Sequence, residues 1–362
     1  MTYFSKGPTL FLGIRVQFCK LALALTVLWC SPIIAHGDDP IAVSRANVIR
    51  TLQSLSDVDS PKWMLGQNVG HGSDDLPAKY QSSFGKLEQQ YGTCPKMLGL
   101  DLGYEETPRS NKTLTRIAKQ HAQRGGVVTI SLHPKSVFGG GLRDVSNRRN
   151  FREIFRKGSM ANLRWLSTLD RVAAQLQVLQ DQGVIVLWRP LHEMNGGWFW
   201  WCPKSDGKWL DKKDFIQLWR ESHDYLVQKK RLRNLIWVYS AAVQTDPTQK
   251  SATHYYPGDA YVDVVGLDYY SNTMDDLDAF GSYSKLAELG KPIGLTEVGP
   301  GPGKRDGSFD AKNVAALMAR HRRLGFVLFW HSWENAKVAI ADISNNAALV
   351  KNPNAMTMRR QN

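Results

Sequence analysis

The residues best suited to chemistry lie in one short stretch, Trp188–Trp201, which reads WRPLHEMNGGWFWW. It combines Arg189, His192, Glu193 and Asn195 with a run of aromatic rings. A core strand rarely holds so many polar groups, because each needs a partner once it is buried. A carboxyl group can donate a proton, and flat rings can stack on the apolar faces of pyranose sugars. The stretch therefore favours a sugar-processing site over a core ion pair packed by tryptophans.

A second carboxyl group in a comparable setting is Glu297, which follows the apolar run Ile293–Leu295. Hydrolysis of a glycosidic bond needs two carboxyl groups that flank the bond. A retaining enzyme holds them roughly 5–5.5 Å apart, whereas about 6.5–9.5 Å indicates inversion. Glu193 and Glu297 are the natural pair, provided that the fold brings them together.

The elements that must position this pair are short apolar runs that alternate with amphipathic segments. Helices are expected at 43–56, 78–91, 113–124, 167–182, 213–229, 280–289 and 311–324. Eight strands are expected, at 63–69, 97–102, 126–132, 184–188, 235–239, 262–267, 293–295 and 326–329. This count in about 300 residues is typical of a single-domain (β/α)8 TIM barrel. A doubly wound open sheet is the alternative, but no glycine-rich nucleotide fingerprint follows the first strand.

A barrel places its chemistry at the carboxyl ends of the strands, and strands four and seven lie nearly opposite each other. Glu193 and Glu297 would then face one another over a substrate. Polar and aromatic residues follow the other strands too. They are His71, Asp101, His133, Asp268, Tyr270, Trp330, His331 and Trp333. Simpler roles compete for some of them: a turn histidine for His133 and His71, a helix N-cap for Asp101, and a surface pair for His331 with Glu334.

The segments RPLHEMNGGWFWW and Thr296-Glu297-Val298-Gly299 resemble glycoside hydrolase family 26, whose members are mostly endo-β-mannanases. The resemblance covers most of the chain after residue 37. It implies a retaining mechanism with Glu193 as acid/base and Glu297 as nucleophile. Val298 replaces the more usual phenylalanine, which does not touch the carboxyl group.

The same resemblance assigns binding roles. Tyr270 would hydrogen-bond the nucleophile, and Asp268 matches another active-site position. His133 would contact the sugar beside the cleaved bond, and His192 would contact the substrate or hold the nucleophile. Trp198 would stack on the leaving-group sugar. Trp330 and Trp333 compete for the place under the attacked sugar, Trp330 being favoured, while Arg189 and Asn195 would support the site.

The expected activity is therefore hydrolysis of β-1,4-mannosidic links without a cofactor or a metal ion. Related β-glucanase or β-xylanase activity, trimming of an exopolysaccharide, and a catalytically silent glycan-binding barrel are the alternatives. A metal-dependent deacetylase would need a cluster of histidine and aspartate that the sequence does not supply.

The 362-residue composition is that of an ordinary globular protein, with 43% apolar and 22% charged residues. Twelve tryptophans favour aromatic binding surfaces. The formal charge of +13 comes from scattered lysines and arginines without a nucleic-acid motif, so no nucleic-acid partner is expected. An anionic polysaccharide or a cell-envelope surface stays open as a partner, and the protein is expected to be a monomer.

The two ends of the chain are expected to lie outside the catalytic domain. Residues 1–37 resemble an export signal, with basic residues before the apolar run Leu21–Trp29 and small residues at Ala35 and Gly37. This predicts a secreted or periplasmic protein, with a retained membrane anchor as the alternative. The catalytic domain is expected at 38–350, followed by a fraying tail at 351–362. In an oxidising compartment Cys94 and Cys202 can form a disulfide.

Overall fold

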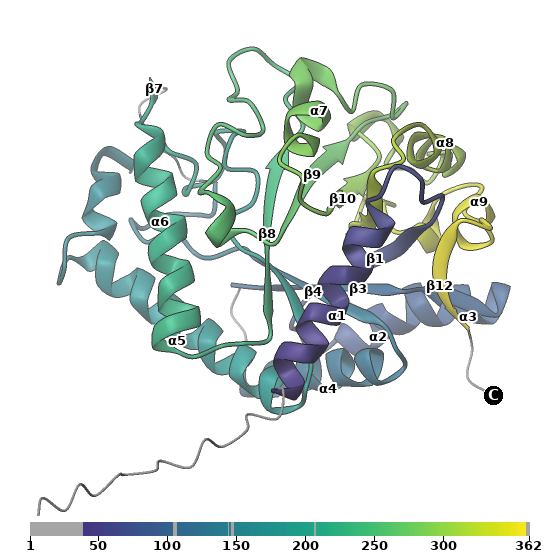
Figure 1. Cartoon of the computed structure of the whole chain (residues 1–362), viewed down its shortest axis with the longest axis horizontal. Helices are drawn as coiled ribbons and strands as arrows, with labels where there is room; N and C mark the ends of the chain where they lie inside the picture. The colour runs from purple at the N-terminus through teal and green to yellow at the C-terminus, as the bar shows by residue number, and fades with distance from the viewer. Residues whose placement is uncertain (1–38, 104–106, 144, 146–147, 206–207, 360–362) are drawn as a thin grey trace, which may run out of the picture. The chain divides into compact units, whose positions relative to one another are not determined.

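Eight parallel strands close into a barrel within the part of the chain that the computed structural model describes (Figure 1). The described residues are 39–359, apart from 104–106, 144, 146–147 and 206–207, so the predicted export signal at 1–37 lies outside them. The strands are β1 (Trp63–His71), β3 (Met97–Leu102), β4 (Val127–Leu132), β5 (Val186–Arg189), β8 (Leu235–Ala242), β9 (Val264–Tyr270), β10 (Ile293–Gly299) and β11 (Leu324–Phe329).

Closure of the barrel comes from pairing between its last and first strands. β11 lies parallel to β1, with Met64 beside Phe326 and Gln67 beside Phe329. All eight strands lie where the apolar runs predicted them, with ends that differ from the predicted ones by at most a few residues. The (β/α)8 barrel is therefore confirmed, and the open-sheet alternative is wrong.

Helices follow most of the strands and form the outer layer (Figure 1). They are α1 (Pro40–Leu55), α2 (Leu76–Tyr80), α3 (Lys86–Tyr91), α4 (Pro108–Gln123), α5 (Met160–Asp181), α6 (Lys212–Asp224), α7 (Ser282–Ala287), α8 (Lys312–Arg320) and α9 (Ala347–Val350). A π-helical turn, Gln81–Gly85, joins α2 to α3, and another, Tyr225–Lys229, extends α6. No helix among the described residues is both long enough and apolar enough to cross a bilayer.

Helix α1 closes the amino-terminal end of the barrel. Its buried residues Leu52 and Leu55 join a cluster of apolar side chains from the first residues of the strands, among them Met64, Met97 and Phe326. Burial of these apolar side chains stabilises this end of the barrel. The opposite end, where the strands finish, is left to hold the chemistry.

The carboxyl-terminal segment forms structure that the sequence did not predict. Strand β12 (Ala355–Arg359) lies parallel to β1 and antiparallel to the short strand β2 (Thr93–Pro95). The expected fraying is therefore wrong for residues 355–359, because the first two pair with β1, the last three pair with β2, and Met358 is buried. A two-stranded hairpin, β6 (Lys204–Ser205) with β7 (Lys208–Trp209), follows the aromatic stretch.

The considered disulfide does not form. Cys94 lies in β2 as a buried free thiol, and its burial raises the pKa to about 11. Cys202 donates a hydrogen bond from Sγ to the backbone oxygen of Glu193, at 3.4 Å. The loop that carries the aromatic stretch is thus fixed by hydrogen bonds rather than by a covalent bridge to Cys94.

Candidate active site

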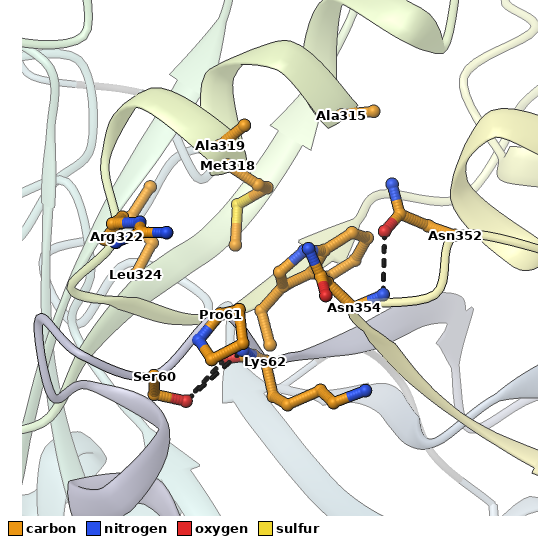
Figure 2. A pocket seen from close by; sticks show the side chains of 11 residues that line it. Ser60, Pro61, Lys62, Ala315, Met318, Ala319, Arg322, Leu324, Asn352 and Asn354 are labelled. Carbon is orange, nitrogen blue, oxygen red and sulfur yellow. Dashed lines mark hydrogen bonds between the residues drawn. The ribbon is translucent and has the colours of Figure 1, made fainter.

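The carboxyl ends of the strands surround an open cleft of about 640 Å³. Its walls are His71, His133, Leu142, Arg143, His192, Glu193, Trp198, Phe199, Tyr270, Glu297, Arg305, Trp330, His331 and Trp333. A smaller hollow of about 90 Å³ lies beside the first residues of β1 and β11 (Figure 2). That hollow is lined by no carboxylate, histidine or cysteine, so the chemistry belongs to the cleft.

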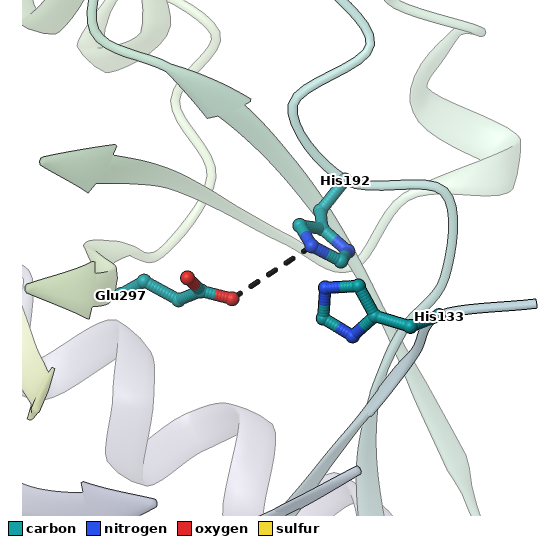
Figure 3. A group of neighbouring side chains, drawn as sticks. All are labelled: His133, His192 and Glu297. Atoms are coloured by element: carbon teal, nitrogen blue, oxygen red, sulfur yellow. Dashed lines mark ion pairs between the residues drawn. The ribbon is translucent and has the colours of Figure 1, made fainter. Parts of the chain in front are cut away.

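Glu297 stands in the wall of the cleft near the end of β10, and it is only 5% exposed. Arg189, from the end of β5, donates a hydrogen bond from Nη2 to its Oε1. The Tyr270 hydroxyl, from the end of β9, donates to its Oε2 at 2.9 Å. Nε2 of His192 lies 3.8 Å from Oε1 (Figure 3). The carboxylate of Glu297 therefore receives hydrogen bonds from a cation and from a phenol.

Arg189 also holds Asp268, and the three groups form one buried network. Nη1 of Arg189 donates to Asp268 Oδ2 at 2.9 Å. Burial by itself would lower the pKa of Arg189, but the charges of Asp268 and Glu297 raise it above its usual value. The Ser240 and Thr296 hydroxyls donate to Asp268 Oδ1 at 2.8 and 2.7 Å. Burial nevertheless raises the pKa of Asp268 to about 7, with Glu297 adding to the effect and Arg189 opposing it.

Glu193 lies opposite, in the loop after β5, with its backbone in the left-handed region at φ 54°. Its Oε2 accepts a hydrogen bond from Trp198 Nε1 at 2.7 Å. Burial, followed by the negative charges of Asp268 and Glu297, raises the pKa of Glu193 well above its usual range. A raised pKa favours the protonated form, as a general acid requires.

The distance between the two carboxyl groups decides how they can act together. One oxygen each of Glu193, Asp268 and Glu297 lie within 4.8 Å of one another. This separation fits the close spacing of retaining glycosidases and leaves too little room for the water of an inverting one. The two glutamates therefore meet as the sequence predicted.

The loop that carries Glu193 is fixed from below by Asn195. Its side-chain amide donates to the backbone oxygens of Ala242 and Lys250 at 2.9 and 3.0 Å, and its Oδ1 accepts from the Ala242 amide at 2.9 Å. Asn195 is fully buried and does not line the cleft. Its place suits the supporting role that the resemblance gave it. Trp200 and Trp201 anchor the loop as well, because each donates its indole N–H to a backbone oxygen.

His133 and His192 point toward Glu297 from neighbouring strands (Figure 3). Their rings meet edge to face, with centroids 4.4 Å apart. Burial and the positive charge of Arg189 lower the pKa of His192 well below its usual value, so it is neutral. One ring nitrogen of each histidine and an oxygen of Glu297 lie within 4.8 Å of one another. A metal ion there would compete with Arg189 for the same carboxylate, which weighs against a metal site.

Asp101 sets the orientation of His133. It is fully buried and accepts hydrogen bonds from His133 Nδ1 at 2.6 Å and from Ser131 at 3.0 Å, while His71 Nδ1 lies at 3.3 Å. Burial opposes ionisation, but the histidine contacts lower the pKa of Asp101 far below its usual value. The N-cap alternative for Asp101 is wrong, because Thr107 caps the next helix, α4.

Three tryptophans border the cleft. Trp198 lies beside Glu193, while Trp330 and Trp333 come from the segment after β11. Trp330 packs against His133 with ring centroids 5.8 Å apart, and Trp333 is 42% exposed at the rim. Both candidate rings thus reach the cleft.

The sequence reasoning missed part of the lining. It noticed His71 and His331 as strand-end residues but favoured turn and surface roles for them, whereas both line the cleft. It did not single out Phe199, Arg143 or Arg305 as binding residues. Arg143 and Arg305 lie in loops beyond strand ends, where no local sequence pattern predicts whether a side chain faces the cleft.

Comparison with known proteins gives a consistent result. Residues 52–359 match the model of glycosyl hydrolase family 26. The chain is 37% identical over 214 residues to a mannan endo-1,4-beta-mannosidase of Caldalkalibacillus mannanilyticus, covering 58% of this chain but only 40% of that protein. It is 30% identical to a mannan endo-1,4-beta-mannosidase of Bacillus subtilis, over 89% of this chain and 90% of that one.

A solved structure agrees with these relatives. A Bacillus subtilis mannanase superimposes with a TM-score of 0.75 at 26% identity, over 87% of this chain and 93% of the other. The matched region contains the whole barrel and both glutamates. The chain therefore belongs to glycoside hydrolase family 26, and it is an enzyme that hydrolyses O-glycosyl bonds.

Proposed function

We propose that the protein is an exported, retaining endo-β-1,4-mannanase in which Glu193 is the acid/base and Glu297 the nucleophile. The observation that carries the proposal is the approach of the two carboxyl groups to within 4.8 Å at facing strand ends. Their environments differ in the sense that the reaction needs: Glu193 keeps a proton, and Glu297 is held by Arg189 and Tyr270. The mannanase names of the relatives support the choice of mannan as substrate.

In the first step Glu297 attacks the anomeric carbon and forms a carbon–oxygen bond to it. The bond from that carbon to the leaving sugar breaks at the same time, and the departing oxygen takes the proton of Glu193. Trp198 donates its indole N–H to Glu193, so it lies beside the leaving group and offers a ring for stacking. Trp330 and Trp333 border the other part of the cleft wall.

In the second step a water molecule attacks the same carbon, and Glu193, now ionised, takes its proton. The bond to Glu297 breaks, and the carboxylate of Glu297 is restored. The negative charge of Glu297 is one cause of the raised pKa of Glu193. Esterification removes that charge, so the pKa of Glu193 falls when the residue must act as a base.

The experiment that tests this function is a cleavage panel. Purified protein is incubated with mannan, glucomannan, mixed-linkage β-glucan and β-1,3-xylan, and reducing ends are counted. We expect the highest kcat/KM on mannan or glucomannan, with β-configured products at the first time points by NMR. Glu193→Gln and Glu297→Gln serve as inactive controls. An α-configured first product would exclude retention, and binding without any cleavage would favour a silent barrel.

The export proposal rests on the basic and apolar pattern of residues 1–37 and needs its own test. Expression in a bacterial host, followed by fractionation and N-terminal sequencing, should give a soluble periplasmic or secreted chain that begins near residue 38. A membrane-bound chain that still begins at Met1 would favour the anchor. Size-exclusion chromatography of the processed protein should show the proposed monomer.

A further inference from the structure

Apart from the two glutamates, the cleft carries an excess of positive charge. Among its described lining residues, the other groups with a permanent charge are Arg143 and Arg305, and both are cations. Neutral polysaccharides offer only hydroxyl groups, which do not require a permanent cation. Two guanidinium groups in the same cleft therefore call for a reason.

Arg305 lies in the loop after β10, above the ring that holds the nucleophile. Its guanidinium carbon is 5.9 Å from the centre of the Tyr270 ring and 5.2 Å from that of Trp333. Its Nε donates to the backbone oxygen of Pro300 at 3.2 Å, which fixes the head group while its other nitrogens stay available. Within the described residues Arg305 forms no ion pair, so its charge is not neutralised by a neighbour.

Arg143 lies on the other side, in the long loop after β4. It is exposed, and its guanidinium carbon is 5.5 Å from the centre of the Phe199 ring, next to Trp198 in the chain. Residues 133–159 contain seven basic and two acidic residues, a net charge of +5 out of the +13 of the whole chain. Arg152 and Arg156 pair with Asp214 and Glu153, but no described carboxylate pairs with Arg143.

We propose that the natural substrate is an acidic β-glycan, with carboxylate groups on sugars close to the cleaved bond. This inference rests on the proposed function, because Glu193 and Glu297 would cut that glycan. A guanidinium group offers a planar fork of donors that matches a carboxylate, and a partly desolvated pair of this kind is stronger than a bond to a hydroxyl. Arg305 would bind an anionic sugar on the nucleophile side, and Arg143 one near Trp198.

The simplest competing explanation is that the arginines only pack on aromatic rings and keep the protein soluble. In that case they would treat a charged and an uncharged polymer alike, apart from a general attraction by the net charge. A distant arginine separates these effects. Arg322 lines the hollow at the opposite end of the barrel (Figure 2), so Arg322→Gln removes the same charge without touching the cleft.

The test uses two polymers with the same backbone: mannan, and mannan in which a small fraction of the C6 hydroxyl groups has been oxidised to carboxylates. kcat/KM is measured on both at low and high salt. We expect the wild type to prefer the oxidised polymer by about fivefold at low salt, with a smaller preference at high salt. Arg143→Gln and Arg305→Gln should each reduce this ratio, and the double variant should bring it close to one. Arg322→Gln should keep the wild-type ratio.

The outcomes separate this inference from the proposed function. Cleavage of neutral mannan with equal rates on both polymers would overturn the acidic substrate and leave the mannanase standing. An equal loss of preference in Arg322→Gln would overturn it too. If neither polymer is cleaved, affinity electrophoresis on the same two polymers decides. If the oxidised polymer retains the protein and the retention depends on the two arginines, the acidic-glycan inference is supported without the mannanase function. If neither polymer retains the protein, both the inference and the proposed function are overturned.

Discussion

The two proposed catalytic carboxyl groups line the same cleft but are held in opposite ways. Glu297 belongs to a regular strand and receives hydrogen bonds from a buried arginine and a tyrosine. Glu193 stands on a left-handed residue of a loop and receives one described side-chain hydrogen bond, from Trp198. Glu297 lies against a cation, whereas burial and nearby negative charges raise the pKa of Glu193. This difference suits the proposed roles of Glu297 as nucleophile and Glu193 as acid, because different partners surround the same kind of side chain.

The largest effect should come from removing the nucleophile. Glu297→Gln leaves an amide that cannot form the covalent intermediate, so kcat/KM should fall by about 10⁴-fold or more. The loss should be equally severe on mannan and on an aryl mannoside with an activated leaving group, because both need the attack. Circular dichroism of the variant controls for folding. Substantial activity of a folded variant on the aryl mannoside would contradict the role of Glu297.

Glu193→Gln should lower kcat/KM far more on mannan than on a substrate with an activated leaving group. Loss of the acid should lower kcat/KM on mannan by about 10²–10⁴-fold. The effect on a dinitrophenyl mannoside should be small, because dinitrophenolate departs without a proton. Steady-state kinetics on both substrates measures the contrast. Equal losses on the two would remove the assignment of Glu193 as the acid.

Arg189→Met tests how much the buried cation beside Glu297 contributes to the stability of the fold. The change leaves Asp268 and Glu297 buried without their cation, so the free energy of unfolding should fall by about 3–5 kcal/mol. Urea denaturation followed by tryptophan fluorescence measures it. Arg156→Gln is the control, because it breaks a solvent-exposed ion pair with Glu153 and should leave the free energy of unfolding almost unchanged. Similar losses in both variants would mean that the buried network does not depend on its charges.

The smallest effect concerns the pH profile. The Trp198 hydrogen bond stabilises ionised Glu193, so Trp198→Phe should raise the pKa of Glu193 further. Activity requires the protonated form, and it is lost as the pH rises through that pKa. The alkaline limb of kcat/KM on mannan should therefore move to higher pH, by up to about one unit. The same limb should be absent on the dinitrophenyl mannoside, and a shift to lower pH would show that Trp198 acts by another route.

Much of this molecule could be predicted from its sequence, because the strands are buried on both faces and appear as short apolar runs. The residues at their ends, such as Glu193 and Glu297, then follow from the barrel rule. The partners of each residue were harder to predict. Whether Arg189 meets Asp268, Glu297 or both depends on the stagger between strands, which local patterns do not encode.

Other features depend on contacts between distant parts of the chain. Strand β12 forms because the first residues of β1, which β3 does not reach, and the short strand β2 can pair with a segment that has little pattern of its own. Arg143 and Arg305 enter the cleft through the paths of long loops, and no spacing rule sets those paths. The buried role of Asp101 likewise follows from a histidine 32 positions later in the chain.

The backbone at Glu193 has a consequence for how this enzyme can change. A φ of 54° suits glycine, and any residue with a Cβ atom pays about 1 kcal/mol to stay there. Glu193→Gly should therefore give a firmer fold than Glu193→Ala, although both are equally unable to donate a proton. Selection for heat stability alone would favour glycine at this position, so the proposed role of Glu193 as proton donor gives a reason for a glutamate there.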